Sequence, residues 1–91
     1  MPRFNTDPTP NPNSLKFTTD AGLFIPSGME SFSSAAEAEA HPLGSRLFAI
    51  PGVANVFILP QFLTITKTPA ANWNVLLPKV RAALEAHFAG N

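Results

Sequence analysis

The stretch VANVFILPQFLTITK, residues 53–67, decides the fold of this chain. Residues 53–59 and 62–67 are rich in β-branched and aromatic side chains, which is typical of strands. Only Pro60 and Gln61 separate the two runs, so we expect them to pair as an antiparallel hairpin. Two-residue hairpin loops prefer a positive φ that proline cannot adopt, which predicts a bulge or a longer loop.

On the N-terminal side of this hairpin, the sequence predicts two further strands. Residues 14–19 alternate polar and apolar side chains, so that Leu15, Phe17 and Thr19 share one face. Residues 29–32 predict a second, shorter strand. Residues 1–13 hold four prolines and three asparagines, and because proline restricts the residue before it, we expect an extended lead-in.

Three segments carry helix signals. Ser34 and Glu37 fit a capping box at the start of an alanine-rich segment. Pro42 either stops that helix or opens the next as its first residue. Asn72 is a suitable N-cap for a last helix, although Pro78 either distorts its first turn or delays its regular part to about Leu77. The apolar residues of this last helix recur with helical spacing at Trp73, Leu76, Leu77, Val80, Leu84 and Phe88.

Strands and helices in this order predict an α+β fold in a single domain, residues 1–91. Helices are expected to cover one face of a small antiparallel sheet. The prediction is a two-layer sandwich with about four strands and two to three helices on one face.

The composition excludes several classes of function. A formal net charge of zero argues against nucleic acid and against a polybasic membrane anchor. The absence of cysteine excludes disulfides and thiolate ligation of zinc or of an iron–sulfur cluster within this chain. We therefore expect no cofactor and no metal. No apolar run approaches the length of about 20 residues that spans a membrane, and no leader pattern is seen, so a cytoplasmic protein is expected.

Few side chains suggest chemistry. Glu37 and His41 could share a helix face and bind a metal, but an alanine-rich solvated helix explains them as well. His87 is expected to be partly buried near a helix end, where a cation is mildly favoured. Lys16 and Lys67 could receive an acidic partner or could guard sheet edges. Phenylalanines at 17, 57 and 62 could stack bases, although core packing is the default.

Four stretches carry a family resemblance. They are residues 9–17 (TPNPNSLKF), residues 34–38 with 41–43, residues 46–53 (RLFAIPGV), and residues 62–67 with Asn72-Trp73 and Leu77-Pro78. Together they resemble the N-terminal domain of the Nfu/NifU-like iron–sulfur scaffold proteins over residues 9–88. The resemblance implies a two-layer α/β domain. In that family a second domain with a Cys-x-x-Cys motif usually follows and binds the cluster, whereas this chain is expected to be a stand-alone N-terminal domain without cluster ligands.

The resemblance implies a non-catalytic accessory or adaptor in iron–sulfur cluster assembly. Its partners would be assembly or carrier proteins, including a separate Cys-x-x-Cys NifU-like domain. Partner contact is predicted at Asn11, Asn13, Lys16 and Lys67, although the prolines could merely set the path into the first strand while the asparagines cap turns.

Two alternatives stay open. An exposed apolar patch at residues 23–25 would favour a generic interaction module without an iron–sulfur role, and such a module could be homo-oligomeric. A small enzyme would need a pocket in which His41 or His87 meets a carboxylate. The sequence leaves the oligomeric state open.

Overall fold

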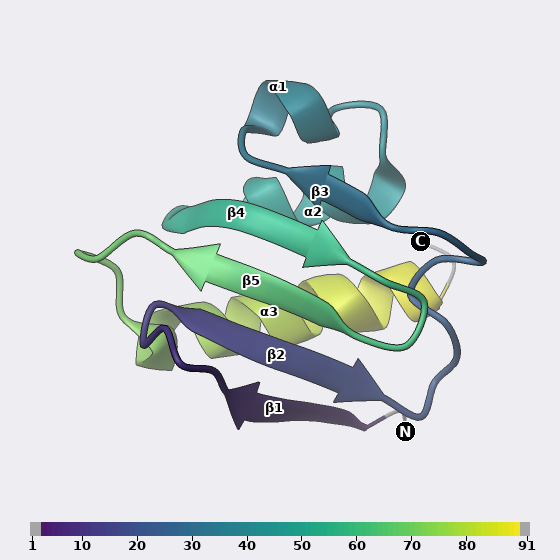
Figure 1. The fold of residues 1–91 in the computed structure, drawn as a ribbon, viewed down its shortest axis with the longest axis horizontal. Helices are drawn as coiled ribbons and strands as arrows, with labels where there is room; N and C mark the ends of the chain where they lie inside the picture. Colours follow the sequence, from purple (N-terminus) through teal and green to yellow (C-terminus); the bar gives the residue numbers. More distant parts are fainter. Residues whose placement is uncertain (1–2, 90–91) are drawn as a thin grey trace.

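A computed structural model describes residues 3–89 of the chain (Figure 1). Its five strands form one sheet in the order β1-β2-β5-β4-β3, and all neighbours are antiparallel. The strands are β1 (Phe4–Pro8), β2 (Ser14–Thr19), β3 (Glu30–Phe32), β4 (Val53–Ile58) and β5 (Leu63–Lys67). The helices are α1 (Ala35–Ala38), α2 (Pro42–Phe48) and α3 (Trp73–Phe88). The predicted α+β class is confirmed, with one strand more than expected.

The β4–β5 hairpin lies inside the sheet, as the sequence of residues 53–67 predicts. Its connection is longer than two residues, because β4 ends at Ile58 and β5 begins at Leu63. The Leu59 N–H donates to the Phe62 carbonyl oxygen at 2.8 Å and closes the loop. A register shift between Val53 and Asn55 marks an irregularity at the start of β4.

The additional strand is β1, which lies in the segment predicted to be a plain extended lead-in. Residues 4–8 are extended, but residues 9–13 turn the chain back so that β1 pairs with β2. The Ser14 N–H donates to the Asn11 carbonyl oxygen at 2.9 Å, which is the hydrogen bond of a β-turn. The expectation that residues 9–13 run extended was therefore wrong. Proline restricts its neighbour but does not prevent a turn.

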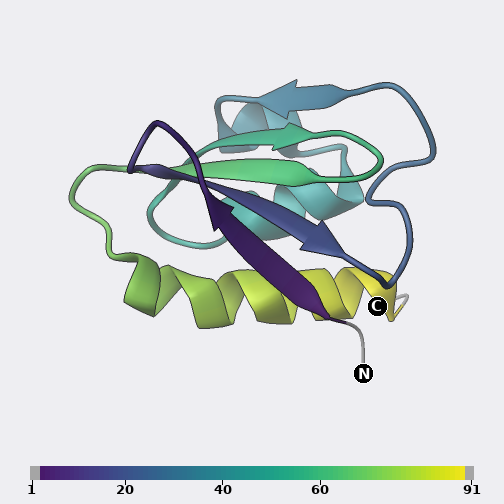
Figure 2. The same cartoon turned by 60° about the horizontal axis from the view of Figure 1, so that its bottom comes forward.

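Two helices cover one face of the sheet (Figure 2). In Figure 1 α2 and α3 lie behind the sheet, and Figure 2 shows α3 running below it, so that the core fills the space between the layers. Every strand from β2 to β5 contributes buried side chains to this layer: Phe17, Phe32, Val56, Ile58, Leu63 and Ile65. The helices contribute Ala38, Leu43, Leu47, Leu76, Val80 and Leu84. Burial of this apolar surface is the main term that stabilises the domain.

The helix starts follow the predicted caps. Ser34 Oγ accepts from the Glu37 N–H at 3.2 Å, and the Glu37 carboxylate accepts in return from the Ser33 N–H at 2.8 Å. The reciprocal bond of the capping box thus reaches one residue further back than the motif predicts. Pro42 opens α2, and the His41 Nδ1 caps it by accepting from the Gly44 N–H at 3.1 Å.

The last helix begins at Trp73, with Asn72 as its N-cap, and continues through Pro78. A delayed start near Leu77 is therefore not observed. Pro78 is exposed, so its ring lies on the solvent side of α3. None of the helices in the described part of the chain is long and apolar enough to cross a membrane.

The apolar run at residues 23–25 does not form an exposed patch. Phe24 is 2% exposed and Ile25 is 7% exposed, and only Leu23, at 54%, faces solvent. The Phe24 N–H donates to the Pro60 carbonyl oxygen at 2.8 Å, which ties this loop to the β4–β5 connection. The apolar patch that would have favoured a generic interaction module is therefore not there.

Candidate partner-binding surface

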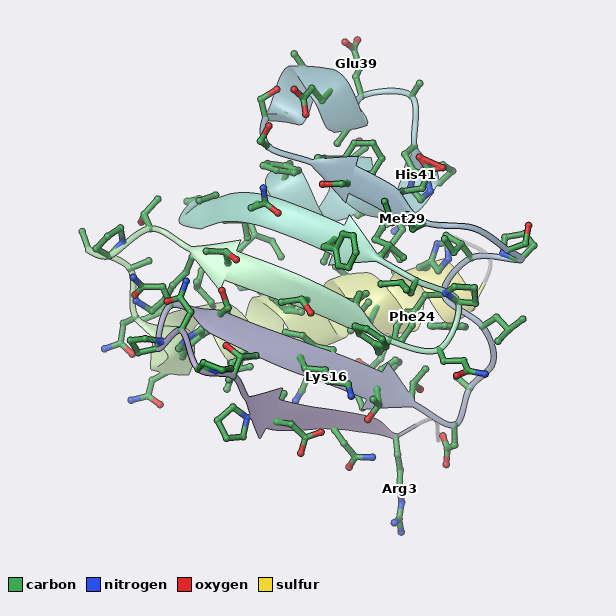
Figure 3. All side chains as sticks on the ribbon, viewed as in Figure 1. Arg3, Lys16, Phe24, Met29, Glu39 and His41 are labelled. Atoms are coloured by element: carbon green, nitrogen blue, oxygen red, sulfur yellow. The ribbon has the colours of Figure 1, made fainter. Side chains whose placement is uncertain are left out.

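The sheet has one face that no described helix covers, here called the front face. Strand alternation places Lys16, Thr18, Phe57, Phe62, Thr64 and Thr66 on it, opposite the buried side chains of the same strands. Figure 3 views this face and shows Lys16 in front of β2. These side chains are half-buried, because neighbouring strands screen them although no second layer does.

One row of front-face residues runs in register across all five strands. Asp7 pairs with Lys16, Lys16 with Thr64, Thr64 with Phe57, and Phe57 with Ser31. Directly opposed residues have Cβ atoms about 5 Å apart. The row therefore places Lys16 between Asp7 and Thr64, with the ring of Phe57 one strand beyond Thr64.

Lys16 is held over an aromatic ring. Its Nζ lies 4.7 Å from the centroid of Phe62, within the range of a cation–π interaction. Lys16 as a whole is half-buried, as is usual for a lysine whose stem packs along the sheet. Lys16 lies on β2 and Lys67 on β5, both inside the sheet, so the edge-guard interpretation of these lysines was wrong.

The turn between β1 and β2 carries a second group of polar residues. Asn11 Oδ1 accepts from the Asn13 N–H at 2.9 Å, and Asn13 Oδ1 accepts from Lys67 Nζ at 2.9 Å. The Thr9 hydroxyl donates to the Asn11 carbonyl oxygen at 2.9 Å. The side-chain oxygens of both asparagines therefore accept hydrogen bonds that stabilise the turn, as the turn-capping alternative predicts.

The turn is anchored to both layers. The indole N–H of Trp73 donates to the Pro12 carbonyl oxygen at 3.4 Å, and its ring lies 6.4 Å from Phe17. On the front face, the hydroxyl groups of Ser14 and Thr66 are 2.7 Å apart. Trp73 is thus an amphipathic anchor between helix and turn.

The four predicted contact residues do not form a single cluster. The structure brings Asn11, Asn13 and Lys67 together at the turn, while Lys16 lies separately on the front face with Phe62. A partner-binding role for these residues stays a prediction. Core packing is confirmed for Phe17, but this default was wrong for Phe57 and Phe62, which lie on the front face. The alternation of Phe57 with the buried Val56 and Ile58 signals this face.

His41 and Glu37, the pair considered as metal ligands, each have a capping role in the structure. His41 caps α2 and its ring lies 5.3 Å from that of Phe32, while Glu37 caps α1. The described residues contain no group of three or more histidine, aspartate or glutamate side chains that could hold a metal ion.

His87 departs from the expectation that its helix end favours a cation. Burial lowers the pKa of His87, and the positive charges of Arg46 and His41 lower it further. A backbone hydrogen bond at Phe24 acts in the opposite direction and raises this pKa. Burial and the two neighbouring positive charges therefore lower the pKa of His87, although a position near a helix C-terminus would favour its charged form.

The architecture defines a small two-layer α+β domain with one open sheet face. Residues 4–91 match the family described as scaffold protein Nfu/NifU N terminal, and the chain belongs to this family. It is 41% identical over 85 residues to the human mitochondrial NFU1 iron-sulfur cluster scaffold homolog, covering 92% of this chain and 33% of that protein. The Drosophila willistoni homolog is 39% identical over 84 residues, with 92% and 29% covered.

Solved structures share the fold. The solution structure of a NifU-like protein from Saccharomyces cerevisiae matches with a TM-score of 0.84 at 28% identity, covering 98% of this chain and 80% of that one. A Staphylococcus epidermidis protein matches with a TM-score of 0.59 at 30% identity, with 91% and 94% covered. The chain spans about a third of the length of the curated relatives it matches.

Proposed function

We propose that this domain is a non-catalytic accessory in iron–sulfur cluster assembly and acts by protein–protein contact through its front face. Membership of the Nfu/NifU N-terminal family and the names of its scaffold relatives support the process. The single observation that supports the mode of action is the front face: a sheet surface without a covering layer, on which Lys16 lies over Phe62.

The chemistry of the front face suits a protein partner. Aromatic side chains, phenylalanine among them, are enriched in the buried centre of interfaces, and a charge such as that of Lys16 steers a partner of opposite charge. Phe57 and Phe62 are half-buried and held by the sheet, so little conformational entropy is lost when a partner covers them. Threonines at 18, 64 and 66 supply hydroxyl groups around them.

The partner that fits best is a cluster-loaded Cys-x-x-Cys domain of the NifU type. A chain without cysteine cannot offer thiolate ligands, so a cluster must be held by another domain or protein. Thiolates are anionic ligands, so the cluster-bearing surface favours a cation nearby, and Lys16 is a cation that lies over Phe62 on the front face. Asn11, Asn13 and Lys67 lie at the turn, at one end of the sheet, and are proposed as secondary contacts.

The absence of catalysis and the cytoplasmic location belong to the same proposal. The charged groups that shift the pKa of His87 are Arg46 and His41, neither of which could orient it as a base in the way a carboxylate does.

The cytoplasmic location stays a prediction, because the curated relatives have the word mitochondrial in their names. Imaging of the tagged chain in its own cell would test it.

A backbone-amide NMR titration tests the proposal. The labelled chain is titrated with a cluster-loaded Cys-x-x-Cys NifU-like domain, and separately with the same domain without cluster. Saturable shifts on β2, β4 and β5 are expected, because these strands carry the front face. Shifts only on α3, or none at millimolar concentration, would contradict contact through this face. Equal binding of other small proteins would favour a generic interaction module.

A further inference from the structure

Among residues 3–89, the outer edge of strand β1 has no neighbouring strand. Backbone groups of successive strand residues point alternately to the two sides. The Arg3 N–H donates to Asp20 Oδ1 at 2.9 Å, and the Arg3 carbonyl oxygen accepts from the Thr19 hydroxyl at 2.6 Å, so Arg3 faces β2. Phe4 and Thr6 therefore turn their N–H and C=O groups away from the sheet.

The pairing on the other side of β2 gives the same result. The Lys67 N–H donates to the Asn13 carbonyl oxygen at 2.8 Å, so Asn13 faces β5. Alternation along β2 then makes Lys16 face β1, where its register partner is Asp7. Asp7 therefore faces β2, which again leaves Thr6 pointing outward. Two independent hydrogen-bond patterns thus agree on which groups of β1 are free.

The charges on this edge are self-complementary. Arg3 and Asp7 are both exposed and stand four residues apart, on the same face of the strand, with Asn5 halfway between them. If a second β1 lies antiparallel with Asn5 opposite Asn5, then Phe4 opposes Thr6 and Arg3 opposes Asp7. This register pairs all four outward groups of each strand and places opposite charges face to face at both ends.

We propose that two copies of this chain associate through their β1 edges, antiparallel and centred on Asn5, and so extend the sheet across a two-fold axis. Other centres fail the charge test: a centre at Phe4 sets Arg3 opposite Asn5, and a centre at Thr6 sets Arg3 opposite Thr9. Pro8 has no N–H to donate, so it ends the window in which a strand can be added. The charges of Arg3 and Asp7 and the missing N–H of Pro8 disfavour the pairing of β1 with other strands. They allow the antiparallel pairing with a second β1.

The surroundings of the edge leave room for the added strand. A hollow of about 290 Å³ lies between β1 and α3 and is lined by Arg3, Phe4, Asn5, Arg81 and Glu85. Figure 2 shows β1 crossing in front of α3, with its outer edge away from the other strands. In the proposed register, Thr6 of the second copy lies opposite Phe4 and its side chain points to the helix side, toward this hollow.

The interface is small, because only residues 3–7 pair. Stable interfaces bury more surface than one short strand offers, so we expect a dissociation constant on the order of 0.1–1 mM. Association is therefore measured by sedimentation equilibrium of the whole chain at concentrations up to about 1 mM. The wild-type average mass is expected to rise with concentration toward that of a dimer.

Charge reversal tests the register. Arg3→Glu and Asp7→Lys each set like charges face to face twice in a dimer, so each variant alone is expected to lose about tenfold or more in association. An equimolar mixture of the two variants restores opposite charges at both ends and is expected to associate like the wild type. Lys79→Glu, an exposed charge change on α3, is the matched control and should leave association unchanged.

Thr6→Pro tests the edge without changing a charge. It removes one outward N–H and spares the bonds between β1 and β2, so a well-dispersed amide spectrum with lost association is expected. The proposal is overturned if the wild type stays monomeric up to about 1 mM, if the charge-reversal mixture fails to associate, or if Thr6→Pro still forms the dimer. The outcome is independent of the iron–sulfur proposal, because no cluster or other protein is present.

Discussion

Lys67 of β5 and Asn13 of the β1–β2 turn are 54 residues apart in the chain and are joined by a hydrogen bond from Nζ to Oδ1 of 2.9 Å. The same two residues are joined a second time, through the Lys67 N–H and the Asn13 carbonyl oxygen at 2.8 Å. This double link fixes the turn against the middle of the sheet. It places the turn residues at one end of the sheet.

Removing either side chain of this link should destabilise the domain. Lys67→Ala or Asn13→Ala each loses one charge-assisted hydrogen bond at a half-buried site, which costs about 1 kcal/mol in the free energy of unfolding. Urea denaturation measures the loss. The double variant should lose less than the sum of the single variants, since both remove the same bond. Strict additivity would show that the bond contributes nothing.

Gly44 in α2 should not tolerate a methyl group. Alanine normally stabilises a helix interior relative to glycine. At this position, however, a Cβ atom would lie 2.9 Å from Phe32 Cε2 and 3.2 Å from the Ala38 Cβ, so α2 would have to move away from β3 and α1. Gly44→Ala is expected to lower the free energy of unfolding by about 1–3 kcal/mol. Ser45→Ala, at the exposed neighbouring position, is the control and should be nearly neutral.

Replacing Pro78 should stabilise the domain. It lies within α3, lacks an N–H for the Asn74 carbonyl oxygen, and is exposed. Pro78→Ala restores that hydrogen bond and should raise the free energy of unfolding by about 1–3 kcal/mol. Pro42→Ala is the matched control, because Pro42 is the first residue of α2, where no N–H is required. A loss of stability in Pro78→Ala would indicate that α3 depends on the ring.

His87 should make stability depend on pH. Its pKa in the folded chain is lowered from the ordinary value of 6.5, so the unfolded chain binds this proton more readily. The stability is therefore fully present above about pH 6.5 and is lost as the pH falls toward the folded pKa. Denaturation with urea at several pH values should show this loss in the wild type and a smaller one in His87→Gln. Identical profiles would contradict the assignment.

Much of the fold is predictable because its signals are local. Strand composition in residues 53–67, the Ser34 cap and the proline that opens α2 each act within a few residues. The strand β1 was missed because its sequence, Phe4–Pro8, shows no regular alternation of apolar residues. It becomes a strand because the turn at Asn11 returns the chain beside β2.

The candidate partner-binding surface is harder to predict from the sequence than the fold. Whether Lys16 and Lys67 lie at an edge or inside the sheet depends on strand order, which is set by contacts between distant segments. The link from Asn13 to Lys67 has no local pattern for the same reason. Alternation in residues 56–58 did contain the signal that Phe57 faces away from the core, but aromatic residues on strands are core residues by default.

The most direct test of the central claim compares the binding of a cluster-loaded Cys-x-x-Cys NifU-like domain to two charge variants. Lys16→Glu reverses the charge that lies over Phe62 on the front face, and Lys79→Glu makes the same change on the exposed side of α3. We expect the dissociation constant, measured by NMR titration, to rise about tenfold or more for Lys16→Glu and to stay unchanged for Lys79→Glu. Equal affinities of both variants and the wild type would contradict contact through the front face.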